Sequence, residues 1–122
     1  MSLRLSHTTF DSLDPFPTAE FWRELLGWEI HEPECYRPGS EECYLRGPRG
    51  EVLLFLRVPD AKKVKNRAHL DLVPENSTRD AEVERALELG ARLVDDRRGD
   101  LSWAVLADPE GNEFCVLSGP GA

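Results

Sequence analysis

The chain has 122 residues, of which 40% are hydrophobic and 31% are charged, and its formal net charge is -8 at pH 7. This length and composition suit one globular domain, and the acidic charge repels phosphate backbones, which argues against nucleic acid as a partner. Because no apolar run approaches the roughly 20 residues that span a bilayer, and the N-terminus lacks a signal-peptide pattern, we expect a cytoplasmic protein without a membrane partner.

The first half of the chain predicts one helix among four strands. Two prolines within residues 14–17 break the chain after the first strand, and Thr18 is a suitable N-cap for the helix that follows. Apolar residues at helical spacing continue to Leu26, and Gly27 ends the helix. We expect strands at residues 3–10, 28–31, 43–46 and 51–58, and an exposed loop at 32–42.

The second half predicts the same order of elements. Ser77 or Thr78 caps a helix whose apolar residues recur at helical spacing, and Gly90 ends it. We expect strands at residues 67–73, 91–94, 101–107 and 112–117. The tail at residues 119–122 is expected to be disordered.

Three pairs of landmarks indicate that the chain repeats itself once. Gly27 and Gly90 end the two helices 63 residues apart, and His7 and His69 lie 62 residues apart on strands that precede them. The turn glycines of the last hairpins, at positions 50 and 111, are 61 residues apart. One such half leaves a face of its sheet unburied. We therefore expect a single domain over residues 1–122, with one module at about 1–60 and a second at about 61–118.

Four segments carry a resemblance to a known family. They are His-Thr-Thr-Phe at residues 7–10 with Asp-Pro at 14–15, the helix end Phe-Trp-Arg-Glu-Leu-Leu-Gly-Trp at 21–28, Asn-Arg-Ala-His-Leu-Asp-Leu at 66–72, and the closing turn and strand at 108–117. In this order and spacing the chain resembles the vicinal oxygen chelate superfamily of glyoxalases, bleomycin resistance proteins and dioxygenases, and most closely its actinobacterial glyoxalase-like branch.

The resemblance implies the fold and the place of the ligand. The expected fold is α+β, with two βαβββ modules forming a curved eight-stranded mixed sheet. An open trough on that sheet would hold a small-molecule ligand, and a metal where one is present. Members of this size are usually homodimers.

The resemblance also implies a set of metal-ligand positions, namely His7, His69 and Cys115. Leu54 occupies a position that sometimes supplies a fourth ligand and has no donor atom. Cys115 stands where metal-binding members carry Glu, so the set suits zinc better than the harder ions of ring-cleaving dioxygenases or glyoxalase I. The alternative is that both histidines line a cavity without metal and that Cys115 is a buried packing residue.

Strand alternation adds polar and aromatic side chains to this trough. Arg67, His69 and Asp71 share one face of their predicted strand, and Arg67 is a candidate for binding a ligand oxyanion. Trp103 is a candidate for stacking on a flat or cationic ligand. The predicted ligand pocket comprises His7, Leu54, Arg67, His69, Asp71, Trp103 and Cys115.

Three functions are compatible with these residues. The sequence favours a protein of the resistance or sequestration type that binds a small organic ligand without metal, because position 115 lacks a carboxylate. The alternatives are a metal-assisted isomerase or lyase that acts on a small oxygenated substrate, and a non-catalytic regulatory module. Catalytic residues are not identifiable from the sequence, and an enzyme on this pattern would have lyase or isomerase chemistry.

The protein is expected to be a homodimer, because each half leaves apolar sheet surface that a second chain would cover. Sedimentation equilibrium should give twice the monomer mass at micromolar concentration. A monomer at high micromolar concentration would contradict this expectation.

Overall fold

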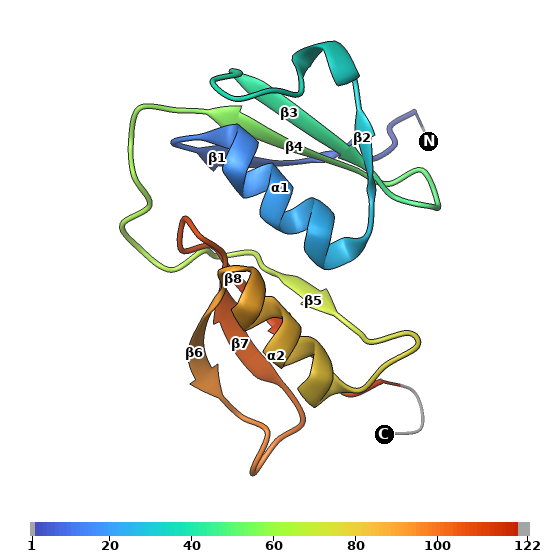
Figure 1. Cartoon of the computed structure of the whole chain (residues 1–122), viewed down its shortest axis with the longest axis vertical. Coiled ribbons are helices and arrows are strands. Elements are labelled where there is room, and N and C mark those ends of the chain that lie inside the picture. The colour runs from blue at the N-terminus through green and yellow to red at the C-terminus, as the bar shows by residue number, and fades with distance from the viewer. Residues whose placement is uncertain (1, 120–122) are drawn as a thin grey trace. The chain divides into compact units, whose positions relative to one another are not determined.

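The structure, a computed structural model, describes residues 2–119 of the chain (Figure 1). The chain divides into two compact units, residues 1–61 and 62–122. Each unit carries the βαβββ order that the repeat predicts, so the α+β fold of two such modules is confirmed. Its eight strands form two four-stranded mixed sheets. The expectation that both units make up one domain stays a prediction.

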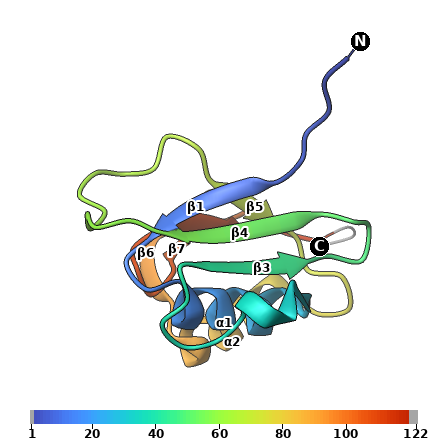
Figure 2. The same cartoon turned by 90° about the horizontal axis from the view of Figure 1, so that it is seen from above.

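The first unit is a four-stranded sheet with one helix on one side, as Figure 2 shows. The strands lie in the order β1-β4-β3-β2, with β1 parallel to β4 and the other neighbours antiparallel. The elements of this unit are β1 (Thr8–Ser12), α1 (Pro15–Leu26), β2 (Glu29–His31), the 3-10 helix η1 (Pro33–Cys35), β3 (Glu42–Arg46) and β4 (Val52–Arg57).

Aromatic stacking fixes which face of the first sheet meets α1. The ring of Phe10 on β1 stacks on Trp22 of α1 at 6.2 Å and on Phe55 of β4 at 5.7 Å. The helix begins at Pro15 rather than after Thr18, because proline is well suited to the first helical turn, where its missing N–H costs nothing. It ends as predicted at Gly27, whose φ of 69° lies in the left-handed region.

The second unit repeats this arrangement. Its strands lie in the order β5-β8-β7-β6, again with a parallel pair, β5 and β8, and two antiparallel pairs. The predicted cap is confirmed, since Thr78 Oγ1 accepts a hydrogen bond from the Ala81 N–H at 3.1 Å. The elements are β5 (Leu70–Leu72), α2 (Arg79–Leu89), β6 (Arg92–Asp96), β7 (Ala104–Ala107) and β8 (Glu113–Val116).

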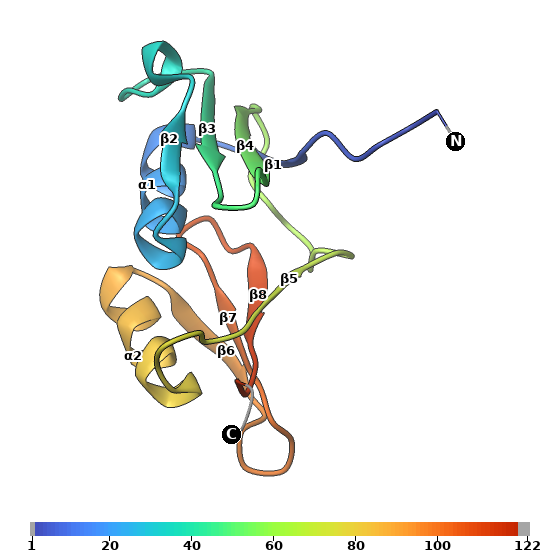
Figure 3. The same ribbon diagram turned by 90° about the vertical axis from the view of Figure 1, so that its right-hand side faces the viewer.

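The core of the second unit lies between its sheet and α2, which covers one side of the sheet in Figure 3. Phe114 of β8 and Leu106 of β7 are fully buried, as are Val83 and Ala86 of α2. Because side chains alternate along a strand, Cys115 and Val105 point to the opposite face. We call this surface, the side of the second sheet turned away from α2, the open face.

Three of the predicted strands, at residues 3–10, 67–73 and 101–107, begin at least two residues later than their sequence patterns. Each strand is limited by its partner, because a strand needs ladder hydrogen bonds: β1 pairs with β4 only from Thr8, and β5 pairs with β8 only from Leu70. His7, His69 and Trp103 therefore lie just before strands rather than within them. Within residues 2–119, neither helix is long and apolar enough to cross a membrane. Of the tail that was predicted to be disordered, residues 120–122 lie outside the described residues.

Asp108 is expected to be a major contributor to the stability of the second unit. Its carboxylate accepts hydrogen bonds from the Glu110 and Asn112 N–H groups, both at 2.9 Å, and from Asn112 Nδ2 at 3.0 Å. Asp108→Ala removes a buried, charged acceptor and should lower the free energy of unfolding by about 3 kcal/mol, measured by urea denaturation. Asp100→Ala removes the same charge from an exposed turn and should change it by less than about 0.5 kcal/mol.

Candidate functional site

Three polar side chains meet on the open face of the second sheet. Asp71 of β5 and Cys115 of β8 are direct partners in the parallel strand pair, and His69 lies two residues before Asp71. His69 Nε2 lies 3.2 Å from Asp71 Oδ1. One donor atom from each of His69, Asp71 and Cys115 lies within 4.8 Å of the other two. The sequence analysis predicted all three residues for the ligand pocket. Of these three, it included His69 and Cys115, but not Asp71, in the predicted set of metal ligands.

The contact between His69 and Asp71 depends on where β5 begins. Side chains two residues apart on a regular strand are separated by roughly 7 Å, which is too far for an ion pair. His69 precedes the first residue of β5, so its backbone is free of strand geometry and its ring turns toward Asp71. Both side chains keep solvent contact, with 38% and 51% of their surfaces exposed.

Cys115 is a protonated thiol at neutral pH in this setting. The pKa of Cys115 is raised to about 11, mainly by burial. The negative charge of Asp71 and the hydrogen bond between Cys115 and Asp71 also raise this pKa, whereas the positive charge of Lys65 lowers it. Asp71 therefore interacts with both His69 and Cys115. A nucleophilic cysteine is activated by a lowered pKa or an adjacent base, and the raised pKa of Cys115 disfavours the thiolate form.

Glu113 lies on the same face of β8 and is held by structural contacts. Its carboxylate lies 3.1 Å from Lys62 Nζ and accepts the Asn66 N–H at 3.1 Å. Although burial raises the pKa of Glu113, the hydrogen bonds from Asn66 and Lys62 outweigh it, and the net shift is downward. These contacts anchor the segment that leads into His69, a role that sequence reasoning missed because it depends on a contact distant in sequence.

The open face becomes apolar away from β5. Val105 of β7 is the register partner of Cys115, and Cys115 is buried and Val105 half-buried, whereas Asp71 of β5 is exposed. Trp103 is half-buried directly before β7, where its carbonyl accepts the Arg97 N–H at 3.0 Å. Trp103 lies just before β7, so the expectation from alternation that it shares a face with Val105 stays a prediction. Arg67 is exposed in the segment before β5.

The remaining two predicted pocket residues belong to the first unit. His7 is exposed, its Nδ1 lies 2.8 Å from Ser6 Oγ, and its ring lies edge-on to Tyr44 at 6.4 Å. Leu54 is buried on β4 between its register partners Thr9 and Tyr44. A metal shared by His7, His69 and Cys115, and a pocket formed by all seven predicted residues, stay predictions.

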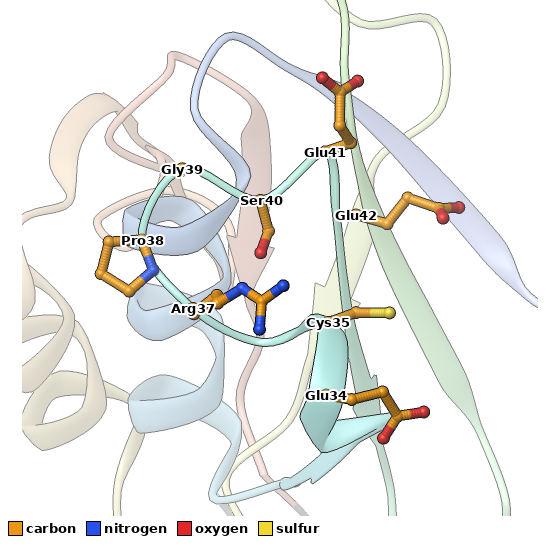
Figure 4. A pocket seen from close by; sticks show the side chains of 8 residues that line it. All are labelled: Glu34, Cys35, Arg37, Pro38, Gly39, Ser40, Glu41 and Glu42. Atoms are coloured by element: carbon orange, nitrogen blue, oxygen red, sulfur yellow. The ribbon is translucent and has the colours of Figure 1, made fainter.

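A separate pocket of about 340 Å³ lies in the loop before β3, in the region predicted as an exposed loop (Figure 4). Tyr36 ties this loop to α1, since its hydroxyl donates to Glu20 Oε2 at 2.6 Å, and Arg23 Nε donates to the same oxygen at 2.7 Å. Within residues 2–119, no buried side-chain nitrogen or oxygen lacks a partner, so no buried polar group awaits a ligand there. The pocket is lined by Glu34, Cys35, Arg37, Pro38, Gly39, Ser40, Glu41 and Glu42.

The contact between Cys115 and Asp71 leads to a pH prediction. In protein treated with a chelator, the Cys115 thiolate should appear with a midpoint near pH 11, followed as the difference in ultraviolet absorbance between wild type and Cys115→Ser. Asp71→Asn should lower this midpoint, because it removes the negative charge that disfavours the thiolate. An unchanged midpoint in Asp71→Asn would mean that burial alone sets the pKa of Cys115.

Comparisons with known proteins agree with this fold. The model of the family described as "Glyoxalase-like domain" matches residues 7–117. The fosfomycin resistance protein FosX from Mesorhizobium loti is 16% identical, with 99% of this chain and 95% of that chain covered and a TM-score of 0.74. A mutant FosX from Listeria monocytogenes, in complex with Mn(II) and 1S,2S-dihydroxypropylphosphonic acid, is 21% identical, with coverages of 99% and 94% and a TM-score of 0.74.

A glyoxalase/bleomycin resistance protein/dioxygenase family enzyme from Burkholderia phytofirmans is 20% identical, with 93% of this chain and 97% of that chain covered and a TM-score of 0.72. At these identities the solved structures show the fold alone. None of the curated proteins matches the chain significantly. Since the family model spans nearly all of the strands and both helices, the chain belongs to the glyoxalase-like domain family.

Proposed function

We propose that this chain binds a small organic ligand on the open face of its second sheet, as a resistance or sequestration protein does. The observation that carries the proposal is the gradient across this face. His69 and Asp71 are exposed polar groups at the β5 edge, whereas Val105 of β7 is half-buried and apolar, and we place the half-buried Trp103, which precedes β7, beside it. Ligand sites commonly combine apolar walls with a few polar groups that set orientation.

The gradient defines the chemistry of the ligand. A hydroxyl or carbonyl group would hydrogen-bond to the His69 ring, and a flat or alkyl portion would lie against Trp103. Arg67 offers a guanidinium for an anionic group, because it is exposed in the segment that leads into His69. The ligand we expect is small, oxygenated at one end and apolar at the other.

The similar structures support this class of ligand. Two of them are fosfomycin resistance proteins, and one of these is in complex with a small dihydroxylated phosphonic acid. Those ligands belong to those proteins. For this chain, fosfomycin and its diol are reasonable first probes, beside small aromatic alcohols and cations.

A metal-assisted isomerase or lyase is the second candidate function. The sequence argued against it because position 115 carries no carboxylate. The Asp71 carboxylate lies beside Cys115, so a nitrogen, an oxygen and a sulfur donor lie within 4.8 Å of one another, which supports this second candidate. An ion bound there would supply Lewis acidity toward a substrate oxygen.

Binding on the open face is tested with a ligand panel and variants of both ends of the gradient. A ligand that raises the melting temperature of wild type should bind at least about tenfold more weakly to His69→Ala and to Trp103→Ala, since each removes a contact of about 1.4 kcal/mol or more. Glu84→Gln, on the exposed side of α2, should bind as wild type does. If Glu84→Gln lost as much affinity as the other two variants, or if those two lost none, the ligand would bind elsewhere on the protein.

A further inference from the structure

We propose that the second unit carries a divalent transition-metal site of its own, most suited to Zn(II), whose ligands are His69 Nε2, an Asp71 carboxylate oxygen and Cys115 Sγ. The site differs from the set His7, His69 and Cys115, because a carboxylate two residues after His69 takes the place of the histidine of the first unit. It goes beyond the proposed function, since the ion would bind with or without an organic ligand.

The distances are close to those that a zinc ion requires. Zinc binds nitrogen and oxygen at about 2.0 to 2.2 Å and sulfur at about 2.3 Å, so tetrahedral ligands lie about 3.3 to 3.6 Å from one another. His69 Nε2 and Asp71 Oδ1 are already 3.2 Å apart, and all three donors lie within 4.8 Å of one another. Side-chain rotations of His69 and Asp71 close the remaining gap, because both side chains are partly exposed.

The backbone supports this geometry at two points. Asp71 and Cys115 are register partners on neighbouring parallel strands, so their separation is set by the sheet. The segment before His69 is anchored where Asn66 donates to Glu113 and to Asn112. Because Glu113 is engaged by Asn66 and Lys62, it is not a free fourth ligand, and the fourth position is left for water or a ligand atom.

The charges also fit a divalent cation. A neutral imidazole, one carboxylate and one thiolate together carry two negative charges, which balance the ion. The thiol proton leaves to solvent when the sulfur binds. The Asp71 carboxylate and the Cys115 thiol lie opposite each other on neighbouring strands, so both donors are placed for the same ion. The Lys65 ammonium donates a hydrogen bond to the Asn66 carbonyl oxygen at 3.4 Å.

The test is metal binding by the full-length, untagged chain after treatment with EDTA. Calorimetric titration with Zn(II) should give one ion per chain, and Co(II) should give a thiolate charge-transfer band. Asp71→Asn and Cys115→Ser should each weaken Zn(II) binding by more than about 100-fold, since loss of an outer-shell partner alone costs 10- to 100-fold. Asp100→Asn and Cys35→Ser, the matched carboxylate and thiol controls, should bind Zn(II) as wild type does.

His7→Ala separates this site from one that includes the first unit, and it should keep the Zn(II) affinity of wild type. The proposal is overturned if wild type binds no Zn(II) stoichiometrically, if Asp71→Asn binds it as tightly as wild type, or if His7→Ala abolishes binding. Circular dichroism of the EDTA-treated variants checks that they are folded. The Co(II) charge-transfer band should be present in wild type and absent in Cys115→Ser. This result tests the sulfur ligand by itself, whereas Asp71→Asn tests the oxygen ligand.

Discussion

The parallel pairing of β5 with β8 is the constraint on which the candidate site depends. It sets Asp71 directly opposite Cys115, although the two residues are far apart in sequence. The same pair of strands turns Phe114 and Val116 toward α2, where both are buried. One pairing register therefore decides both the core of the second unit and the polar groups of its open face, because a shift by one residue would exchange the two faces.

The same division of faces is found in the first unit. Phe10 stacks on Phe55 and on Trp22 of α1, which leaves Leu54 and Tyr44 on the other side of their sheet. Within residues 2–119, each unit has one α-helix, which packs on one face of its sheet. The family resemblance places ligands on the opposite face of each sheet. The physical reason is that side chains on the helix-facing side must pack in the core, whereas those on the opposite side are free of that requirement.

Electrostatics separates structural from functional charges in the second unit. Glu113 and Asp108 are engaged by backbone N–H groups and neighbouring side chains, so their charges support the fold. Asp71 differs, because it faces a histidine and a thiol and keeps about half of its surface in solvent. This difference is the reason why we propose a functional role for Asp71 rather than a structural one.

Much of the fold was predictable from the sequence, because the repeat and the turn residues are local signals. Helix ends at Gly27 and Gly90 and the cap at Thr78 follow from short-range chemistry, and the order of elements follows from periodicity. The strand limits were not predictable. The patterns around His7 and His69 extend beyond the ladder hydrogen bonds, and a strand ends where its partner ends.

The residues of the open face were also identified from the sequence, since alternation placed His69 and Asp71 together and the family resemblance pointed to Cys115. Which atoms meet was decided only by the tertiary structure. Alternation on a regular strand holds His69 and Asp71 apart, whereas the start of β5 at Leu70 frees His69 to reach Asp71 at 3.2 Å. The sequence by itself thus determined the composition of the face, and strand pairing determined its geometry, because ladder hydrogen bonds between distant segments decide where a strand begins.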